Sequence, residues 1–74
     1  MQTAGDPIVK RLGLRVRELR RQRGLSQERL AELAGMHRNY IGALERAELS
    51  PTFLSVSRLA RALGTTVCGL YPYE

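Results

Sequence analysis

The chain has 74 residues, of which 43% are hydrophobic, and it carries a formal net charge of +5. This length predicts one domain, residues 1–74, and the apolar content excludes a disordered chain. No apolar segment approaches the roughly 20 residues of a membrane span, and Met1–Pro7 is too polar for a signal peptide. A single cysteine, Cys68, excludes an internal disulfide. A cytoplasmic protein without membrane contact is therefore expected.

The positive charge is concentrated before Gly24. Seven basic and two acidic residues precede this glycine, so this segment accounts for the whole net charge, and the charges from Leu25 onward cancel. One interpretation is a surface that faces phosphate groups. The other is a solvated helix face in an arginine-rich proteome, because only one of the twelve basic residues is a lysine.

Apolar spacing predicts an all-α fold, a compact bundle of four to five helices, since no segment shows the alternation of a strand. The first helix is expected at about 7–23, between Pro7 in its first turn and Gly24. Its apolar stripe consists of Ile8, Leu12, Val16 and Leu19.

The remaining helices are predicted from their caps. Ser26 precedes a helix at about 27–34, and a third helix follows at about 37–46. Thr52 precedes a fourth helix at about 53–63, and Thr66 precedes a short fifth helix. The expected inner face of the fourth helix is Phe53, Val56, Leu59, Ala60 and Leu63, and that of the fifth is Val67 and Leu70.

The second and third helices have the spacing of a helix-turn-helix over about 27–46. Ala31 is small, so the third helix can cross close to the second. Gly35 can adopt the left-handed backbone that a tight turn between crossed helices needs. The angle between the two helices is expected to be filled by Leu30, Ala34, Ile41 and Leu44.

Three segments carry a resemblance to a known family: LSQERLAELAGM, YIGALER and SPTFLSVSRLARALGTTVCGL. In register they resemble the lambda-repressor-like, or XRE-family, helix-turn-helix domain from about Val9 to Tyr71. The stretch HRNYIGALER is closest in type to restriction–modification controller proteins. The resemblance implies a transcriptional regulator that binds double-stranded DNA. Two residues depart from the family pattern, His37 at the cap of the third helix and Ala47 where glycine is usual.

The third helix is expected to present one open edge. Successive helical residues advance by about 100°, which separates Ile41 and Leu44 from an open wedge that holds Arg38, Asn39, Gly42, Ala43 and Arg46. Arginine can pair with a guanine edge, asparagine with an adenine edge, and an alanine methyl can contact thymine. We therefore expect Arg38, Asn39 and Ala43 to read bases, although a solvated surface would show the same residues.

Other positions are expected beside the DNA backbone. Gln27 begins the second helix, where an anion is favoured, and in the family the matching glutamine binds a phosphate. Arg46 is expected to bind a phosphate. His37 is either a phosphate donor or a turn residue, and Tyr40 either contacts DNA or packs at the groove rim. In similar domains the positions of Arg20 and Glu45 form an interior ion pair, which is the role expected here.

Two base contacts per copy discriminate weakly against the competing sites of a genome, so a homodimer on a palindromic operator is expected. Leu70, Tyr71 and Tyr73 are the candidate dimer contacts, and the alternative is that Leu70 and Tyr71 close the core of the monomer.

An enzyme, a metal site and a cofactor are not expected. His37 and Cys68 are far apart in sequence, and no phosphate loop or nucleophile with a base is present. The rival function is an antitoxin or other protein-binding module, which could also repress its own operon. Besides DNA, RNA polymerase or a toxin protein are therefore conceivable partners, and repression is not distinguished from activation.

Overall fold

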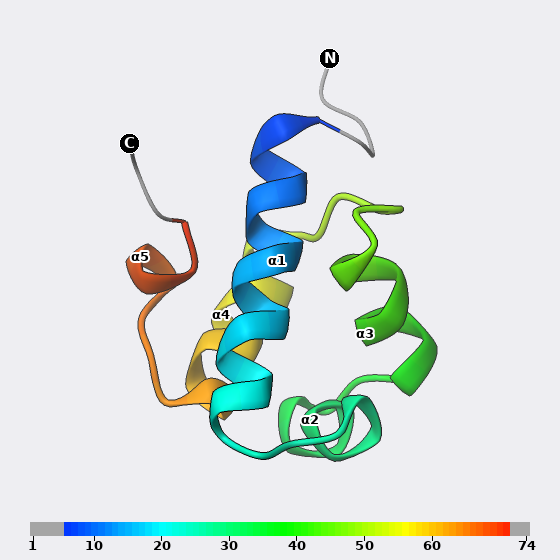
Figure 1. The fold of residues 1–74 in the computed structure, drawn as a ribbon, viewed down its shortest axis with the longest axis vertical. Helices are drawn as coiled ribbons and strands as arrows, with labels where there is room; N and C mark the ends of the chain where they lie inside the picture. Colours follow the sequence, from blue (N-terminus) through cyan, green and yellow to red (C-terminus); the bar gives the residue numbers. More distant parts are fainter. Residues whose placement is uncertain (1–5, 72–74) are drawn as a thin grey trace.

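The computed structural model describes residues 6–71, which contain five α-helices and no strand. The helices are α1 (Pro7–Gln22), α2 (Gln27–Ala34), α3 (Arg38–Glu45), α4 (Phe53–Leu63) and α5 (Val67–Leu70). In Figure 1, α1 runs along the long axis with α3 on one side and α5 on the other, and α2 lies across its lower end. The predicted all-α fold is confirmed, and the bounds of the first four helices agree with the prediction to within one residue.

The predicted caps determine where the helices begin. Three hydroxyl side chains accept a hydrogen bond of 2.9 to 3.1 Å from a backbone N–H three residues further on: Ser26, Thr52 and Thr66. His37 occupies the same position before α3 but makes no side-chain capping bond. The first turn of α3 therefore lacks a stabilising interaction that is typically worth about 1 kcal/mol.

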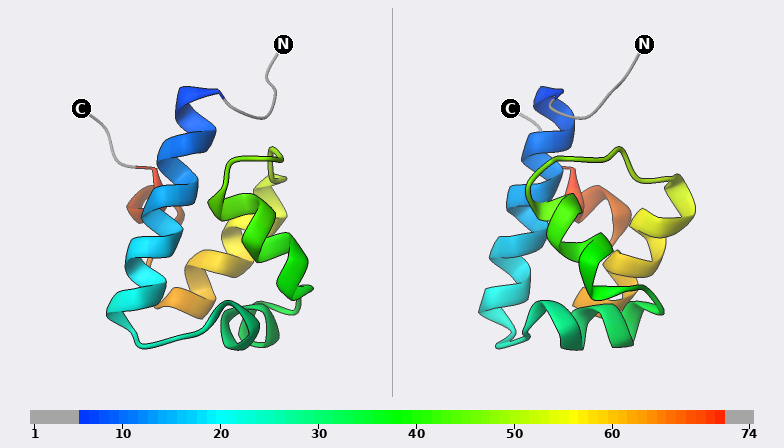
Figure 2. Two further views of the ribbon diagram at one scale, coloured as in Figure 1. Left: turned by 45° about the vertical axis from the view of Figure 1, so that its right-hand side comes forward. Right: turned by 90° about the vertical axis from the view of Figure 1, so that its right-hand side faces the viewer.

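Two left-handed residues position α3. Gly35 ends α2 with φ 71°, which allows the chain to turn at once into α3. Ala47 follows α3 with φ 59°, the one positive φ outside glycine among the described residues. The backbone N–H groups of Ala47 and Glu48 close the helix end by donating to the carbonyls of Leu44 and Ala43, both at 2.9 Å. Figure 2 shows the resulting arrangement, with α3 crossing α2 at the surface of the molecule.

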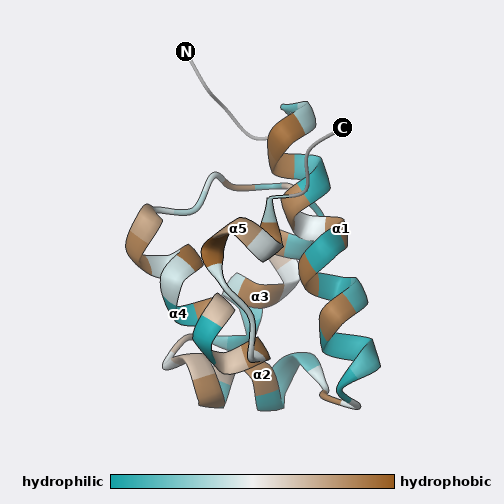
Figure 3. Ribbon diagram, turned by 90° about the vertical axis from the view of Figure 1, so that its left-hand side faces the viewer, coloured by the Kyte–Doolittle hydropathy of each residue, from teal (hydrophilic) through white to brown (hydrophobic). Residues whose placement is uncertain are grey.

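The core lies between the five helices. Its buried members are Leu12, Val16, Leu19, Leu30, Ala31, Ala34, Ile41, Leu44, Val56, Leu59, Ala60, Leu63 and Leu70. Figure 3 shows hydrophobic residues interleaved with hydrophilic ones along α1, as expected for a helix with one buried side.

Two predicted core residues lie outside it. Ile8 is 55% exposed and Val9 is buried in its place, because the first turn of α1 projects beyond its neighbours. Phe53 is 75% exposed. As the first residue of α4, its side chain leans back toward the helix start, before the covered part of the helix is reached.

The fifth helix closes the core. Leu70 is completely buried, so of the two expected roles, a contact between subunits and closure of the monomer core, its burial supports the second. Tyr71 packs partly buried against the core, where burial raises the pKa of its hydroxyl. Arg15 Nε on α1 donates to the Gly69 carbonyl at 3.0 Å and ties α5 to α1. Tyr73 lies outside the described residues.

Candidate nucleic-acid interface

The third helix has one buried edge and one open edge. Ile41 and Leu44 have no exposed surface, whereas Arg38 and Asn39 are both exposed. Neither Arg38 nor Asn39 forms a hydrogen bond or ion pair with its side chain within residues 6–71. In the right-hand view of Figure 2, α3 faces outward and no other described segment crosses in front of it.

The middle of this edge, at Gly42, is less exposed than the helical spacing predicted. Gly42 is buried, because side chains from two other positions lie over it. A Cβ added at Gly42 would lie 3.1 Å from Arg46 Nη1 and 3.6 Å from Gln27 Oε1. The side chains of Gln27 and Arg46 therefore pack over Gly42. The expectation that Gly42 belongs to the open wedge was wrong. Ala43, next to it, is half-buried.

Gln27 connects the start of α2 to α3. It is the first residue of α2, directly after the Ser26 cap, and its side chain is half-buried. Gln27 Nε2 donates to Glu45 Oε1 at 3.1 Å. The amide is thereby held in one orientation at the N-terminus of α2, the end of a helix that favours an anion.

His37 and Tyr40 lie on the other flank of α3. His37 is exposed and Tyr40 is half-buried. Together with Met36, Ser55 and Arg58 they line a shallow groove between the start of α3 and the outer side of α4. Both side chains are therefore at the rim of the open edge.

Arg46 follows α3 and is bound by an acidic neighbour. Its Nε and Nη2 donate to the two carboxylate oxygens of Glu48 at 2.9 and 3.1 Å. Each partner shifts the pKa of the other, since the hydrogen bonds and charge of Glu48 raise the pKa of Arg46 and those of Arg46 lower the pKa of Glu48. Both side chains are more than half exposed, so this pair is open to competition by another anion.

A buried carboxylate fixes α3 against the rest of the fold. Arg20 Nε donates to Glu45 Oε2 at 2.7 Å and Arg20 Nη2 to Glu45 Oε1 at 3.2 Å. Arg20 Nη1 also donates to the Leu25 carbonyl at 2.8 Å. Burial alone raises the pKa of Glu45, but the hydrogen bonds from Arg20 and Gln27, the charge of Arg20 and the nearby Arg17 guanidinium outweigh it, so the net shift is downward.

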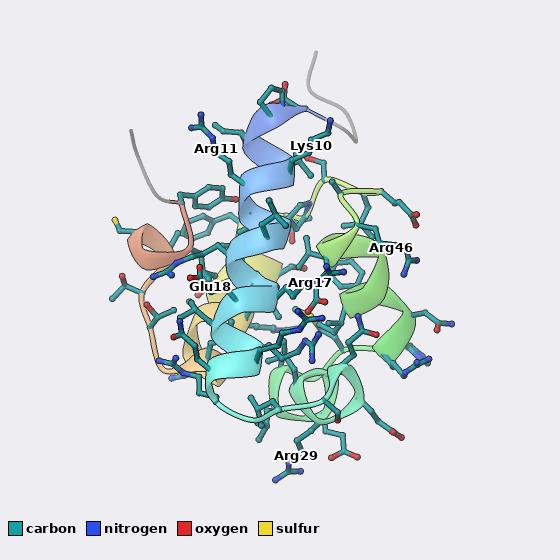
Figure 4. The ribbon with its side chains drawn as sticks, viewed as in Figure 1. Lys10, Arg11, Arg17, Glu18, Arg29 and Arg46 are labelled. Carbon is teal, nitrogen blue, oxygen red and sulfur yellow. The ribbon has the colours of Figure 1, made fainter. Side chains whose placement is uncertain are left out.

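Arg17 was not singled out from the sequence. Its Nε lies 3.5 Å from Glu45 Oε1, and Figure 4 shows the side chain on α1 pointing toward α3. The signal that could have revealed it is its spacing, one turn before Arg20 on the same helix. Glu48 was also missed, although it lies only two residues after Arg46.

Within residues 6–71, no group of three His, Cys, Asp or Glu side chains is arranged to hold a metal ion. No helix in that range has the length and apolar character needed to cross a membrane.

This fold and this open helix edge define a helix-turn-helix transcriptional regulator. Residues 16–70 match the family described as helix-turn-helix, and the chain belongs to that family. Its named relatives are regulators of transcription, a DNA-binding class without enzymatic activity.

Several relatives share most of their length with this chain. Control protein C.SmaI of Serratia marcescens is 48% identical over 60 residues, which cover 81% of this chain and 71% of the relative. An uncharacterized HTH-type transcriptional regulator of Methanothermobacter thermautotrophicus is 49% identical over 49 residues, or 66% and 71% of the two chains. The crystal structure of the restriction-modification controller protein C.AhdI from Aeromonas hydrophila has a TM-score of 0.83 at 40% identity, covering 85% of this chain and 96% of that one.

Proposed function

We propose that this chain binds a palindromic DNA operator as a homodimer, with α3 in the major groove of each half-site. The observation that carries the proposal is the open edge of α3. At the start of the helix, Arg38 and Asn39 are exposed and their side chains form no hydrogen bond or ion pair within residues 6–71, while Ile41 and Leu44 on the opposite edge are buried in the core. In helix-turn-helix proteins the start of the second helix of the motif, which is α3 in this chain, contacts the base edges.

The side chains of the open edge have the chemistry to distinguish bases. Arg38 pairs with the two acceptors of a guanine, and Asn39 pairs with the donor and acceptor of an adenine. The half-buried Ala43 contacts a thymine methyl group. The three positions lie along one side of α3, so they address neighbouring base pairs.

Four further side chains hold the DNA backbone. Gln27 at the N-terminus of α2 and Arg46 beside Gly42 bind phosphate groups on one side of α3, and His37 and Tyr40 contact the backbone on the other side. Contacts of this kind fix the position and register of the protein on the duplex and carry no sequence information of their own.

Energetics favour two copies on one operator. Each bidentate base contact gives about 1–3 kcal/mol of discrimination, so Arg38 and Asn39 together give roughly 2–6 kcal/mol. Rejecting about 10⁶ competing sites takes roughly 8 kcal/mol. One copy falls short of this value, whereas two copies give roughly 4–12 kcal/mol, a range that includes it. The half-sites are then one helical turn apart.

The dimer contact involves a second copy of this chain and apolar side chains that the fold leaves uncovered. Phe53 and Leu54 are adjacent at the start of α4 and are 75% and 59% exposed. Tyr71, partly buried, remains a candidate. Sedimentation of the wild type and of Phe53→Ser tests this point, because loss of a hydrophobic contact shifts the protein toward the monomer. A wild-type monomer both free and on DNA would exclude the dimer.

The regulated operon is proposed from the relatives. C.SmaI is a control protein, and C.AhdI is a restriction-modification controller protein whose solved chain is almost fully covered by this one. We infer that this chain likewise controls the genes of a restriction–modification system.

Selection of bound duplexes from a random library tests the proposal. A motif with two inverted half-sites is expected, and Arg38→Ala should weaken binding to the selected duplex while leaving binding to unrelated duplexes nearly unchanged. Enrichment of no motif, or of one that is bound equally well by Arg38→Ala, would contradict the proposed role of α3.

A further inference from the structure

Two side chains from different helices converge on one oxygen atom. Gln27 Nε2 of α2 lies 3.1 Å from Glu45 Oε1, and Arg17 Nε of α1 lies 3.5 Å from the same atom. Arg17 and Gln27 are therefore neighbours in space, although they belong to different helices. Any ligand group that reaches the Gln27 amide also comes within reach of the Arg17 guanidinium.

The charge at this junction is not balanced. Glu45 supplies one negative charge, and Arg20 already satisfies it by binding both of its oxygens. Arg17 adds a second positive charge to the same carboxylate at a longer distance. Its Nε is buried and has no hydrogen-bond partner among the described residues. A buried N–H without an acceptor costs free energy. Support of the Glu45 carboxylate therefore does not by itself account for the placement of Arg17.

The remaining part of Arg17 is open to a ligand. The side chain is 38% exposed, whereas that of Arg20 is 11% exposed and that of Glu45 is fully buried. A guanidinium has five N–H donors, and within residues 6–71 those of Arg17 form no hydrogen bond. Figure 4 shows this side chain between α1 and α3, on the side of α1 opposite to Glu18.

We propose that Arg17 is a DNA phosphate-binding residue that holds, together with Gln27, one phosphate group at the junction of α1, α2 and α3. The inference rests on the proposed function and adds α1 to the DNA-binding surface. A bound phosphate supplies the acceptors that the Arg17 guanidinium lacks, and it balances the surplus charge beside Glu45. Because Arg17 and Arg20 share Glu45, the same carboxylate that anchors α3 also positions a backbone contact.

The test compares Arg17→Gln with wild type on a selected operator duplex and on a scrambled duplex across a salt series. One lost phosphate contact lowers the slope of log affinity against log salt by about 0.9. Between 50 and 200 mM salt, the ratio of wild-type to variant affinity should therefore shrink about 3.5-fold, equally on both duplexes. Arg17→Lys should restore the slope, since it keeps the charge.

Arg11→Gln is the matched control, because it removes one positive charge from the same helix on the side away from α3 (Figure 4). It should change the slope less than Arg17→Gln. An unchanged slope in Arg17→Gln, or a loss of affinity that only follows a lowered melting temperature, overturns the inference. Wild-type protein that binds neither duplex overturns the proposed function itself, which separates the two failures.

A measurement on the wild type does not depend on any variant folding. The Nε–H resonance of Arg17 should shift when the operator duplex is added, because the guanidinium gains an acceptor. A resonance that does not move at saturating duplex overturns the inference.

Discussion

Gly13 of α1 lies directly against the backbone of Leu44 at the end of α3. A Cβ added at Gly13 would lie 2.5 Å from the Leu44 carbonyl oxygen and 3.0 Å from that of Glu45. Both atoms belong to the backbone, so no side-chain rotation relieves the overlap. The absence of a side chain at Gly13 thus determines how closely α3 approaches α1.

Gly13→Ala should destabilise the fold by about 1–3 kcal/mol, the usual cost of overpacking a core. The sign of this change in the free energy of unfolding is informative, because a glycine-to-alanine substitution elsewhere in a helix interior stabilises by about 0.5–1 kcal/mol. Urea unfolding measures the effect. Leu14→Ala is the control, since Leu14 is 60% exposed and its truncation should be nearly neutral. A Gly13→Ala protein as stable as wild type would mean that α3 can move away from α1 freely.

Glu45→Gln should impair folding before it impairs recognition. The substitution leaves the buried Arg20 guanidinium without its charged partner, and loss of one member of a buried pair costs about 3–5 kcal/mol. Chemical denaturation gives the free energy of unfolding, and DNA binding is then measured under conditions where the variant is folded. Normal stability combined with weak binding would argue for a direct role of Glu45 in DNA contact.

The same carboxylate should make stability depend on pH in the acid range. The pKa of Glu45 in the folded state lies below the ordinary glutamate value of 4.5. Its contribution to stability is therefore complete above that value and is lost as the pH falls through the lower, folded-state pKa. Urea midpoints measured from pH 7 downward should stay level and then fall in wild type. In Glu45→Gln this part of the fall should be missing, and identical acid profiles would refute the assignment.

Arg38→Ala should reduce discrimination at one operator position by about 1–3 kcal/mol. The free energy of unfolding should not change, because Arg38 is exposed and unbonded within residues 6–71. Binding to duplexes substituted at each position identifies the base pair that Arg38 reads. If all positions lose affinity equally, Arg38 contacts the backbone and not a base.

Glu48→Gln should tighten DNA binding a few-fold, since Glu48 occupies two of the donors with which Arg46 is proposed to hold a phosphate. Glu18→Gln is the matched control, because Glu18 is also an exposed carboxylate paired with an arginine, but on the side of α1 away from α3. In protein that already carries Arg46→Gln, Glu48→Gln should increase DNA affinity no more than Glu18→Gln does. A gain that persists there would indicate long-range charge repulsion only.

The features that depend on short stretches of the chain could be predicted from the sequence. Ser26, Thr52 and Thr66 signal helix starts from within three residues, and the α2–α3 turn follows from Gly35. These signals are local, so the helix bounds and the all-α fold could be predicted. The resemblance of the motifs then supplied the pairing of Arg20 with Glu45, which no local rule reveals.

Contacts between distant segments could not be predicted in the same way. Gly42 was expected to be open, but its cover comes from the rotamers of Gln27 and Arg46. Likewise, the contact between Arg17 and Glu45 depends on the rotation of α1 relative to α3. Val9 replaces Ile8 in the core because of where the neighbouring helices end, which a helical period alone does not specify.

The separation between the two edges of α3 has a consequence for how such a regulator diverges. Because the side chains of Arg38 and Asn39 form no hydrogen bond or ion pair in the described chain, exchanging them should leave the scaffold intact. Under the proposed base-reading role, one or two substitutions would then give a new target sequence. Glu45, only a few residues further along, permits no such freedom. On the same proposal, a library randomised at these two exposed positions would consist of folded variants that bind different operator sequences, because the buried core is unchanged.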